Sequence, residues 1–255
     1  FEFKILKTIA LAQNLSSSLK HPVVPIFWMA SEDHDFEEIA SFNLGKDQFS
    51  WSNPDVKGPV GRLATDSLAK QLREFADSLT MTQATRRELE NRIKSYEEEA
   101  NLASATRSWV RSWASELGLL VIDGDDAHLK TLAQPIWDAE KNRELSLAIE
   151  SSSKKLEQAG YKNQVFPRPY NLFSLQGGDR KRILRAEDIP TEVLDISPNA
   201  LLRPMYQEYI LPNLAYVGGG GELAYWMQLG EAFESLREVM PILYLRDSVV
   251  PEVSR

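Results

Sequence analysis

Four short apolar runs, each followed directly by a polar or glycine-rich turn, most constrain what this chain can fold into. They are Val23–Met29, Leu119–Ile122, Leu214–Val217 and Pro241–Leu245. Nearly continuous apolar runs of this length are typical of strands that are buried on both faces. Because helical periodicity fills most of the intervening chain, we predict an α/β fold. Its sheet should be doubly wound and mostly parallel, with the four runs as neighbours or near neighbours.

The intervening segments give further expectations about local structure. The spacing predicts an opening helix through Leu15, an irregular stretch over 42–60, and a helix over 65–79. A long charged helical region near 85–117 should be broken once around Ser104 and end at Gly118. We expect a helix pair over about 127–159, short strands around the turn at Gly177 and Gly178, and a helix over 201–210.

Composition narrows the classes of partner. The 255 residues carry a formal net charge of −8, which argues against a general nucleic-acid surface and against docking on anionic lipid. A local cationic pocket for a small anionic substrate remains possible. The absence of cysteine excludes disulfides and thiolate metal sites and fits a cytoplasmic protein, and no apolar run reaches the length of a membrane span. The first residue is Phe1, and helical spacing of apolar residues is present from the start of the sequence, so we expect the chain to be the interior of a longer product.

A polar cluster, Glu32-Asp33-His34-Asp35, follows the first apolar run. On an exposed loop it would be a solvated group of charges. At the end of a buried parallel strand it lies where open α/β sheets bind their ligands. Asp33, His34 and Asp35 are therefore candidate catalytic residues, which could share a substrate proton or bind a divalent cation. The spacing does not choose between these two roles.

Two further turns follow apolar runs. Asp123-Gly124-Asp125-Asp126 is either a second acidic site or a plain turn that caps the next helix. The segment Gly218-Gly219-Gly220-Gly221-Glu222 lies between a predicted strand and a predicted helix. Its backbone N–H groups could approach a phosphate or carboxylate, although a sharp turn would explain the glycines equally well.

A third candidate binding group comes from one helix. Asn199 and Arg203 are four residues apart, and Gln207 follows one turn later, so the three share a face if the segment is helical. They could clamp a carboxylate. The alternative is that Asn199 caps the helix and Arg203 forms a structural ion pair.

Five motifs, taken in order, resemble the family of bacterial cysteine ligases that complete bacillithiol, a low-molecular-weight thiol. The resemblance covers essentially the whole chain and rests on the segments Pro25-Ile-Phe-Trp-Met-Ala-Ser-Glu-Asp-His-Asp-Phe36, Val121-Ile-Asp-Gly-Asp-Asp126, Tyr170-Asn-Leu-Phe173, Ser197-Pro-Asn-Ala-Leu-Leu-Arg-Pro204 and Tyr216-Val-Gly-Gly-Gly-Gly-Glu-Leu-Ala-Tyr-Trp226.

The resemblance implies a Rossmann-like core of the nucleotidyltransferase type over residues 1–255. Inserted segments are expected at about 42–117 and about 161–197. It also implies a C-terminal coiled coil that pairs subunits into a homodimer, and neither this arm nor the expected glycine-rich segment before Phe1 is in the sequence.

The family's reaction joins the carboxyl group of cysteine to the amine of glucosaminyl-malate. Forming an amide from a carboxylate in water needs an activated intermediate, so we expect ATP and, with it, a divalent cation such as Mg²⁺. His34 and its flanking acids would act near the reacting centre. Phosphate or malate carboxylates would be held by the glycine segment and Arg203.

Two alternatives stay open. A nucleotidyltransferase-like enzyme could use the same fold on another acid and amine. A non-catalytic scaffold that dimerises through a missing arm is the other, and it predicts decay of the polar strand ends. Both acidic turns and the glycine segment are intact, which favours an enzyme.

Overall fold

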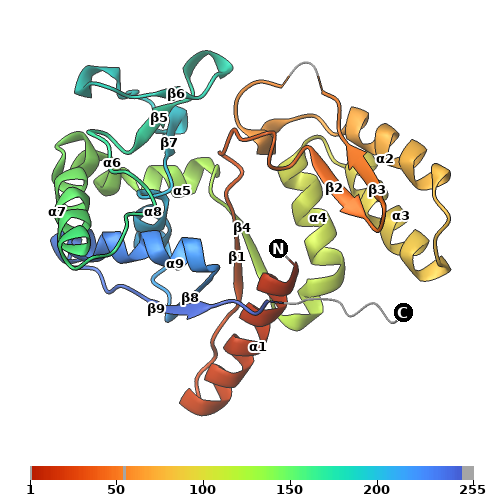
Figure 1. The fold of residues 1–255 in the computed structure, drawn as a ribbon, viewed down its shortest axis with the longest axis horizontal. Helices are drawn as coiled ribbons and strands as arrows, with labels where there is room; N and C mark the ends of the chain where they lie inside the picture. Colours follow the sequence, from red (N-terminus) through yellow and green to blue (C-terminus); the bar gives the residue numbers. More distant parts are fainter. Residues whose placement is uncertain (1, 54–55, 249–255) are drawn as a thin grey trace. The chain divides into compact units, whose positions relative to one another are not determined.

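The computed structural model describes residues 2–53 and 56–248, and the chain divides into two compact units (Figure 1). The first unit takes its described residues from Phe1–Pro25, Asp126–Gln176 and Lys181–Arg255. The second consists of Ile26–Asp125 and Gly177–Arg180. Each unit is described by itself.

A pair of parallel strands carries the two acidic turns of the second unit. Strand β1 (Ile26–Met29) pairs with β4 (Leu120–Asp123), in a register that sets Ile26 opposite Leu120 and Met29 opposite Asp123. Both strands therefore end at the same edge. The residues that follow them, from Ala30 and from Gly124, start at that edge.

Helices and a hairpin complete the second unit. The segment expected to be irregular contains an antiparallel hairpin, β2 (Ser41–Leu44) and β3 (Asp47–Ser50), whose turn uses Gly45 at a φ of +65°. Alternation is weak in these short strands, so the sequence did not signal them. Three helices follow, α2 (Asp66–Ser78), α3 (Gln83–Glu98) and α4 (Leu102–Ala114).

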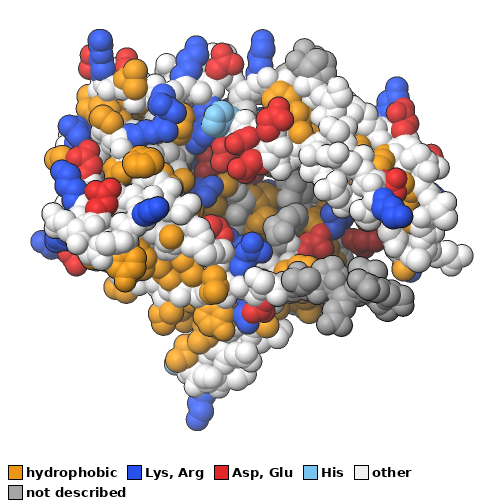
Figure 2. All heavy atoms as spheres, in the orientation of Figure 1, with side chains coloured by type: hydrophobic (Ala, Val, Ile, Leu, Met, Phe, Trp, Pro, Cys, Tyr) orange, Lys and Arg blue, Asp and Glu red, His pale blue; other side chains and the backbone are white. Residues whose placement is uncertain are grey.

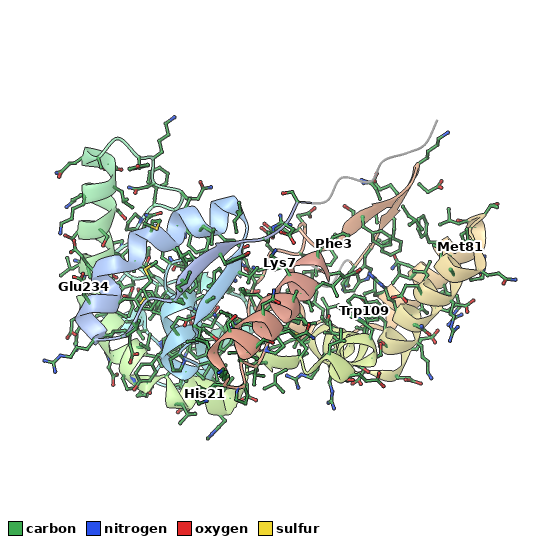
Figure 3. The ribbon with its side chains drawn as sticks, turned by 90° about the horizontal axis from the view of Figure 1, so that it is seen from below. Phe3, Lys7, His21, Met81, Trp109 and Glu234 are labelled. Atoms are coloured by element: carbon green, nitrogen blue, oxygen red, sulfur yellow. The ribbon has the colours of Figure 1, made fainter. Side chains whose placement is uncertain are left out.

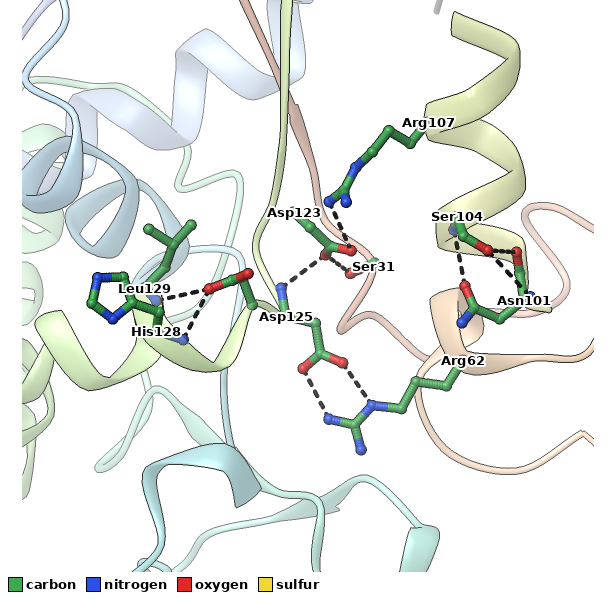
Figure 4. A network of polar contacts seen from close by, with 10 residues as sticks. Ser31, Arg62, Asn101, Ser104, Arg107, Asp123, Asp125, His128 and Leu129 are labelled. Carbon is green, nitrogen blue, oxygen red and sulfur yellow. Dashed lines mark hydrogen bonds and ion pairs between the residues drawn. The ribbon is translucent and has the colours of Figure 1, made fainter. Parts of the chain in front are cut away.

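The predicted break near Ser104 lies just before α4, where Asn101 caps the helix by accepting the Ser104 backbone N–H at 2.9 Å. The Ser104 hydroxyl in turn accepts the Asn101 backbone N–H (Figure 4). The predicted end at Gly118 is confirmed, with φ at +79°.

Apolar side chains from the hairpin and the helices form the core of the second unit. Its buried members are Phe49, Trp51, Val60, Leu63, Leu68, Leu72, Ala76, Leu89 and Ile93. Arg92 of α3 lies over the ring of Trp109 of α4 at 4.1 Å from the centroid, which adds a cation–π contact between these helices. Figure 3 shows Trp109 and, beyond the end of α2, Met81.

Strands of the first unit form two further sheets. Strand β8 (Ala215–Gly218) pairs in parallel with β9 (Ile242–Leu245), and the opening helix α1 (Glu2–Leu19) contacts β8. Figure 3 shows Phe3 and Lys7 along α1, with His21 past its end. An antiparallel sheet has the order β6 (Lys181–Arg182), β5 (Leu172–Ser174) and β7 (Ile196–Pro198).

The helices of the first unit are α5 (Ala127–Leu132), α6 (Gln134–Lys141), α7 (Glu144–Gln158), α8 (Arg203–Ile210), α9 (Gly220–Trp226) and α10 (Gly230–Leu236). Where a helix pair was expected over 127–159 there are three helices, because the chain turns again at Arg143, whose φ is +65°. Trp137, Tyr206 and Trp226 are at most 1% exposed and anchor the core of this unit.

The four predicted strands all exist, but the prediction of one sheet that contains them is wrong for the described residues. β1 pairs with β4 and β8 pairs with β9, in separate two-stranded sheets that belong to different units. The prediction that these strands are buried on both faces is also wrong for β9, where Ile242 and Leu245 are 70% and 59% exposed. An apolar run does not specify which strand is the neighbour.

The segment predicted as an insertion at 42–117 lies wholly within the second unit, and that at 161–197 has residues in both. The division into one core with insertions therefore stays a prediction. None of the described helices combines the length and the apolar character needed to cross a membrane.

Candidate functional site

The residues after β1 are held close to those after β4. The buried Glu32 carboxylate and the indole nitrogen of Trp28 both lie against Gly124, where an added Cβ would come within 2.9 Å of each. Gly124 also donates its N–H to the Met29 carbonyl at 2.8 Å. Glycine in the second acidic turn is therefore required by packing against the first.

The backbone of the first acidic cluster is pinned by a neighbouring loop. Val60 donates its N–H to the Asp33 carbonyl at 2.6 Å, and Gly61 donates to the Ser31 carbonyl at 2.9 Å. A Cβ at Gly61 would lie 2.4 Å from the Ser31 Cβ. The position of the Asp33-His34 dipeptide thus depends on a close approach that only glycine permits.

Asp33 and His34 are joined by Arg180, a residue that sequence reasoning missed. Its Nη1 lies 2.7 Å from His34 Nδ1 and 3.2 Å from Asp33 Oδ1, while Asp33 Oδ1 also accepts the backbone N–H of His34 at 2.7 Å. Arg180 is 147 positions from Asp33, and its only sequence signal was its place after the Gly177-Gly178 turn. Asp35, the third predicted catalytic residue, is exposed, and its role stays a prediction.

Two more arginines pair with the second acidic turn (Figure 4). Asp123 accepts a hydrogen bond from the Ser31 hydroxyl and lies 3.7 Å from Arg107 of α4. Asp125 accepts two hydrogen bonds from Arg62, at 2.6 and 3.0 Å. The strand ends of the second unit therefore gather alternating acids and arginines, a set suited to a polar, ionised ligand.

Asp126 has a structural role. Its side chain accepts the backbone N–H groups of His128 and Leu129, at 2.9 and 3.1 Å, and so caps α5. The helix-cap alternative for the second acidic turn is confirmed for this residue. His128 takes part through its backbone (Figure 4).

The glycine segment joins β8 to α9, as predicted, and its own glutamate occupies part of it. Glu222 accepts the Gly219 backbone N–H at 2.7 Å, the Tyr216 hydroxyl at 2.8 Å and the Lys4 ammonium at 2.8 and 3.0 Å. Burial raises the pKa of the Glu222 carboxyl, but the hydrogen bonds from Gly219 and Lys4 outweigh it and the pKa is lowered overall. Burial also raises the pKa of the Tyr216 hydroxyl, with Tyr225 and Glu222 acting in the same direction.

This carboxylate limits which anions the glycine segment could bind. The Gly219 N–H already has an acceptor, whereas a Cβ at Gly219 would meet the Arg246 guanidinium at 3.1 Å and one at Gly220 would meet nothing within 4 Å. An anion at this segment could use the Gly219 N–H only by displacing the Glu222 carboxylate. Gly218 is closely packed, since a Cβ there would lie 2.9 Å from Tyr216.

Asn199, the first residue of the predicted anion clamp, forms hydrogen bonds within the protein. The Asn199 side-chain oxygen accepts the backbone N–H groups of Leu201 and Leu202, at 2.9 and 3.0 Å, and its nitrogen donates to Asn171 at 2.8 Å. Asn199 thus closes the turn that leads into α8, whose N-cap residue is Leu202, and the Arg203 N–H donates to the Asn199 carbonyl at 2.9 Å.

The other two members of the predicted clamp differ from Asn199. Gln207 donates to the Glu208 carboxylate at 3.0 Å. Arg203 is half-buried, and its charge acts on the Tyr216 hydroxyl beside the glycine segment. Among the three, Arg203 therefore keeps the clearest link to a candidate binding group.

A buried polar network surrounds the Tyr170–Phe173 motif. Glu140 of α6 is fully buried and accepts the Ser146 hydroxyl at 2.6 Å and the Asn171 backbone N–H. Asn171 continues the chain of hydrogen bonds to Asn199. Burial raises the pKa of Glu140, and the hydrogen bonds from Asn171 and Ser146 offset part of that effect.

The described residues contain no group of three or more histidine, aspartate or glutamate side chains arranged to hold a metal ion. His34 belongs to the second unit and Gly218–Gly221 to the first, so the common cleft implied by their positions after strands stays a prediction.

Comparison with known proteins finds the same family that the motifs resemble. A family model described as the N-terminal Rossmann-like domain of bacillithiol biosynthesis BshC matches residues 1–194 and 186–247. Proteins named "Putative cysteine ligase BshC" from Flavobacterium johnsoniae and Flavobacterium psychrophilum are 39% and 38% identical over 98% of this chain. The corresponding protein of Christiangramia forsetii is 36% identical over 100% of it.

The chain spans about half the length of these relatives, 51%, 50% and 52% respectively. Both the family model and the relatives cover the strand-end cluster after β1 and the turn that carries Arg180. The Rossmann-like core that the resemblance implies agrees with the family model. This chain belongs to the BshC family of bacillithiol biosynthesis.

Proposed function

We propose that the protein containing this chain is an ATP-dependent ligase that joins the carboxyl group of cysteine to the amine of glucosaminyl-malate. The observation that carries the proposal is the Asp33-His34-Arg180 cluster at the end of β1, with Arg180 only 6% exposed. A guanidinium buried against a histidine is not expected in a segment with a purely structural role, because burying a charge is unfavourable unless polar partners compensate. The BshC name of the relatives supports the reaction class.

The residues of the chain would contribute binding and charge stabilisation. His34, half exposed beside a buried arginine, would contact the reacting groups. Arg203 and Arg246 would hold phosphate or malate oxygens near the glycine segment. ATP, when bound, would supply the activation that a carboxylate lacks. Holding the reactants together would then supply a large part of the rate.

Other parts of the proposal concern the whole protein. We propose a core of the nucleotidyltransferase type, a coiled-coil arm in the complete protein that pairs subunits into a homodimer, and a cytoplasmic location. Cysteine, glucosaminyl-malate and ATP would be the small-molecule partners, with Mg²⁺ arriving with the nucleotide.

The test is mass spectrometry of small molecules formed by the full-length protein with cysteine, ATP and glucosaminyl-malate, with each omitted in turn. The expected result is the bacillithiol mass, formed only in the complete mixture, together with AMP or ADP. Product with another amine but not with glucosaminyl-malate would favour the nucleotidyltransferase-like alternative. No ATP consumption with any acid and amine pair would favour a scaffold.

A matched pair of variants makes this test sharper. His34→Asn should abolish most product, whereas Arg182→Gln, an exposed arginine of β6 two residues from Arg180, should leave product formation unchanged. An equal loss of product in both variants would show that the loss does not depend on the Asp33-His34-Arg180 cluster.

A further inference from the structure

The turn that carries Arg180 packs closely against the segment of the second unit that contains Gly58. Gly177 and Gly178 have φ values of +77° and +85°, which favour glycine. A Cβ at Gly58 would lie 2.3 Å from the Gly178 carbonyl oxygen, so the two backbones are in direct contact. Residues Gly177–Arg180 belong to the second unit although the strands on either side, β5 and β6, belong to the first. The chain therefore enters the second unit for these four residues, and Arg180 lies in the same unit as Asp33 and His34.

The guanidinium is then held among polar groups. The Arg180 side chain is 6% exposed, and its Nη1 reaches both Asp33 Oδ1 and His34 Nδ1. The His34 side chain, by contrast, is 48% exposed. One nitrogen of the ring thus faces a buried cation while the side chain as a whole stays accessible.

This contact determines which ring nitrogen carries the proton. A guanidinium has N–H donors and no acceptor, so a 2.7 Å approach to Nδ1 requires Nδ1 to present its lone pair. The alternative, Nδ1–H donating to Asp33 Oδ1, has the longer distance of 3.3 Å, and it would set two N–H groups against each other. The neutral ring therefore carries its proton on Nε2.

We propose that Arg180 is the positioning residue of His34, fixing the ring as an Nε2–H donor so that it donates a hydrogen bond and does not accept a proton. The role of His34 rests on the proposed function: the Nε2–H group would stabilise negative charge on a carboxyl or phosphate oxygen of the reactants. Removal of the amine proton falls to another group. Asp33 would hold Arg180 in place and would not act on substrate.

The tautomer can be measured directly by two-bond ¹H–¹⁵N correlation spectra of the chain labelled with ¹⁵N-histidine, well above the ordinary histidine pKa of about 6.5. The chain has three histidines, and His34→Asn assigns the signals of His34 by their loss. The wild-type chain should give an Nε2–H pattern with an unprotonated Nδ1.

In Arg180→Met the Nδ1 signal should move toward the protonated position, because Asp33 Oδ1, 3.3 Å away, can then accept a hydrogen bond from Nδ1–H. Arg180→Lys keeps a cationic donor and should restore the wild-type pattern at least in part. The matched control, Arg182→Met, should leave it unchanged. Unaltered far-UV circular dichroism confirms that the variants are folded.

An Nδ1–H pattern for His34 in the wild-type chain overturns the proposal, and it does so even if Arg180→Met fails to fold. An identical Nε2–H pattern in wild type and folded Arg180→Met also overturns it, since Arg180 would then not set the tautomer. The spectra need no substrate. A failure of the ligase assay with the predicted spectra would therefore reject the proposed function and leave the role of Arg180 intact.

Discussion

Glu140 offers the sharpest test of how the buried network stabilises the first unit. The side chain is fully buried and accepts hydrogen bonds from Ser146 and from the Asn171 backbone. Glu140→Gln keeps an acceptor oxygen and removes the charge, whereas Glu140→Ala removes the acceptor as well. The two variants therefore separate hydrogen bonding from ionisation.

The expected loss follows from the donors left without a partner. A buried donor deprived of its acceptor costs about 1–3 kcal/mol, and the Ser146 hydroxyl can turn toward another acceptor while the Asn171 N–H cannot. We expect Glu140→Ala to unfold at a free energy about 1–3 kcal/mol lower than Glu140→Gln at every pH.

The charge of Glu140 makes the free energy of unfolding depend on pH. Burial raises the pKa of Glu140 above its ordinary value of 4.5, so the folded chain binds the proton more tightly than the unfolded chain. Stability is then greatest below the ordinary value and falls as the pH rises through the raised one. Each tenfold difference in proton affinity between the two states corresponds to about 1.4 kcal/mol. Wild type should therefore lose stability relative to Glu140→Gln as the pH rises to neutrality.

The assay is urea unfolding of the three proteins, followed by circular dichroism at a series of pH values. Glu208 also has a pKa raised by burial, but it is present in all three proteins and cancels in the differences. Parallel curves for wild type and Glu140→Gln would refute the reasoning on charge. Equal midpoints for the alanine and glutamine variants would refute the reasoning on hydrogen bonds.

Three other changes have defined outcomes. Gly61→Ala should destabilise the fold by about 1–3 kcal/mol, since its Cβ would lie 2.4 Å from that of Ser31, whereas Gly230→Ala meets nothing within 4 Å and should be neutral or slightly stabilising in denaturant titrations. His34→Asn in the full-length protein should lower turnover about 100- to 1,000-fold at an unchanged thermal midpoint, as loss of one donor to developing negative charge does, and near-wild-type turnover would remove it from the reaction. Arg62→Ala breaks a bidentate ion pair whose arginine side chain is 50% exposed, so the loss should stay within about 1 kcal/mol and shrink with added salt; a larger, salt-independent loss would contradict this.

Local features were predictable because their causes are local. The cap at Gly118 needs only its left-handed φ, and the four strands follow from apolar runs bounded by polar turns. The position of the first acidic cluster after β1 follows from the same pattern. The hairpin at 41–50 was missed because strands this short carry too few alternating residues to show a period.

Contacts between distant segments had no signal along the chain. Asn199 read equally as a ligand clamp and as a helix cap until its amide was seen bound to Leu201, Leu202 and Asn171. Glu222 was grouped with an open anion site, yet its carboxylate takes the Gly219 N–H. Hydrogen-bond partners are chosen by three-dimensional proximity, and one sequence does not encode that in any readable spacing.

The sequence by itself determined the family, the alternation of strands and helices, and the acidic and glycine-rich turns, because these depend on residue order over a few positions. Tertiary structure alone decided that the strands pair as β1 with β4 and β8 with β9, and that Arg180 meets His34 across 146 positions. The turn that carries Arg180 packs there against Gly58, and this contact is available because Gly58 has no side chain: a Cβ at Gly58 would lie 2.3 Å from the Gly178 carbonyl oxygen.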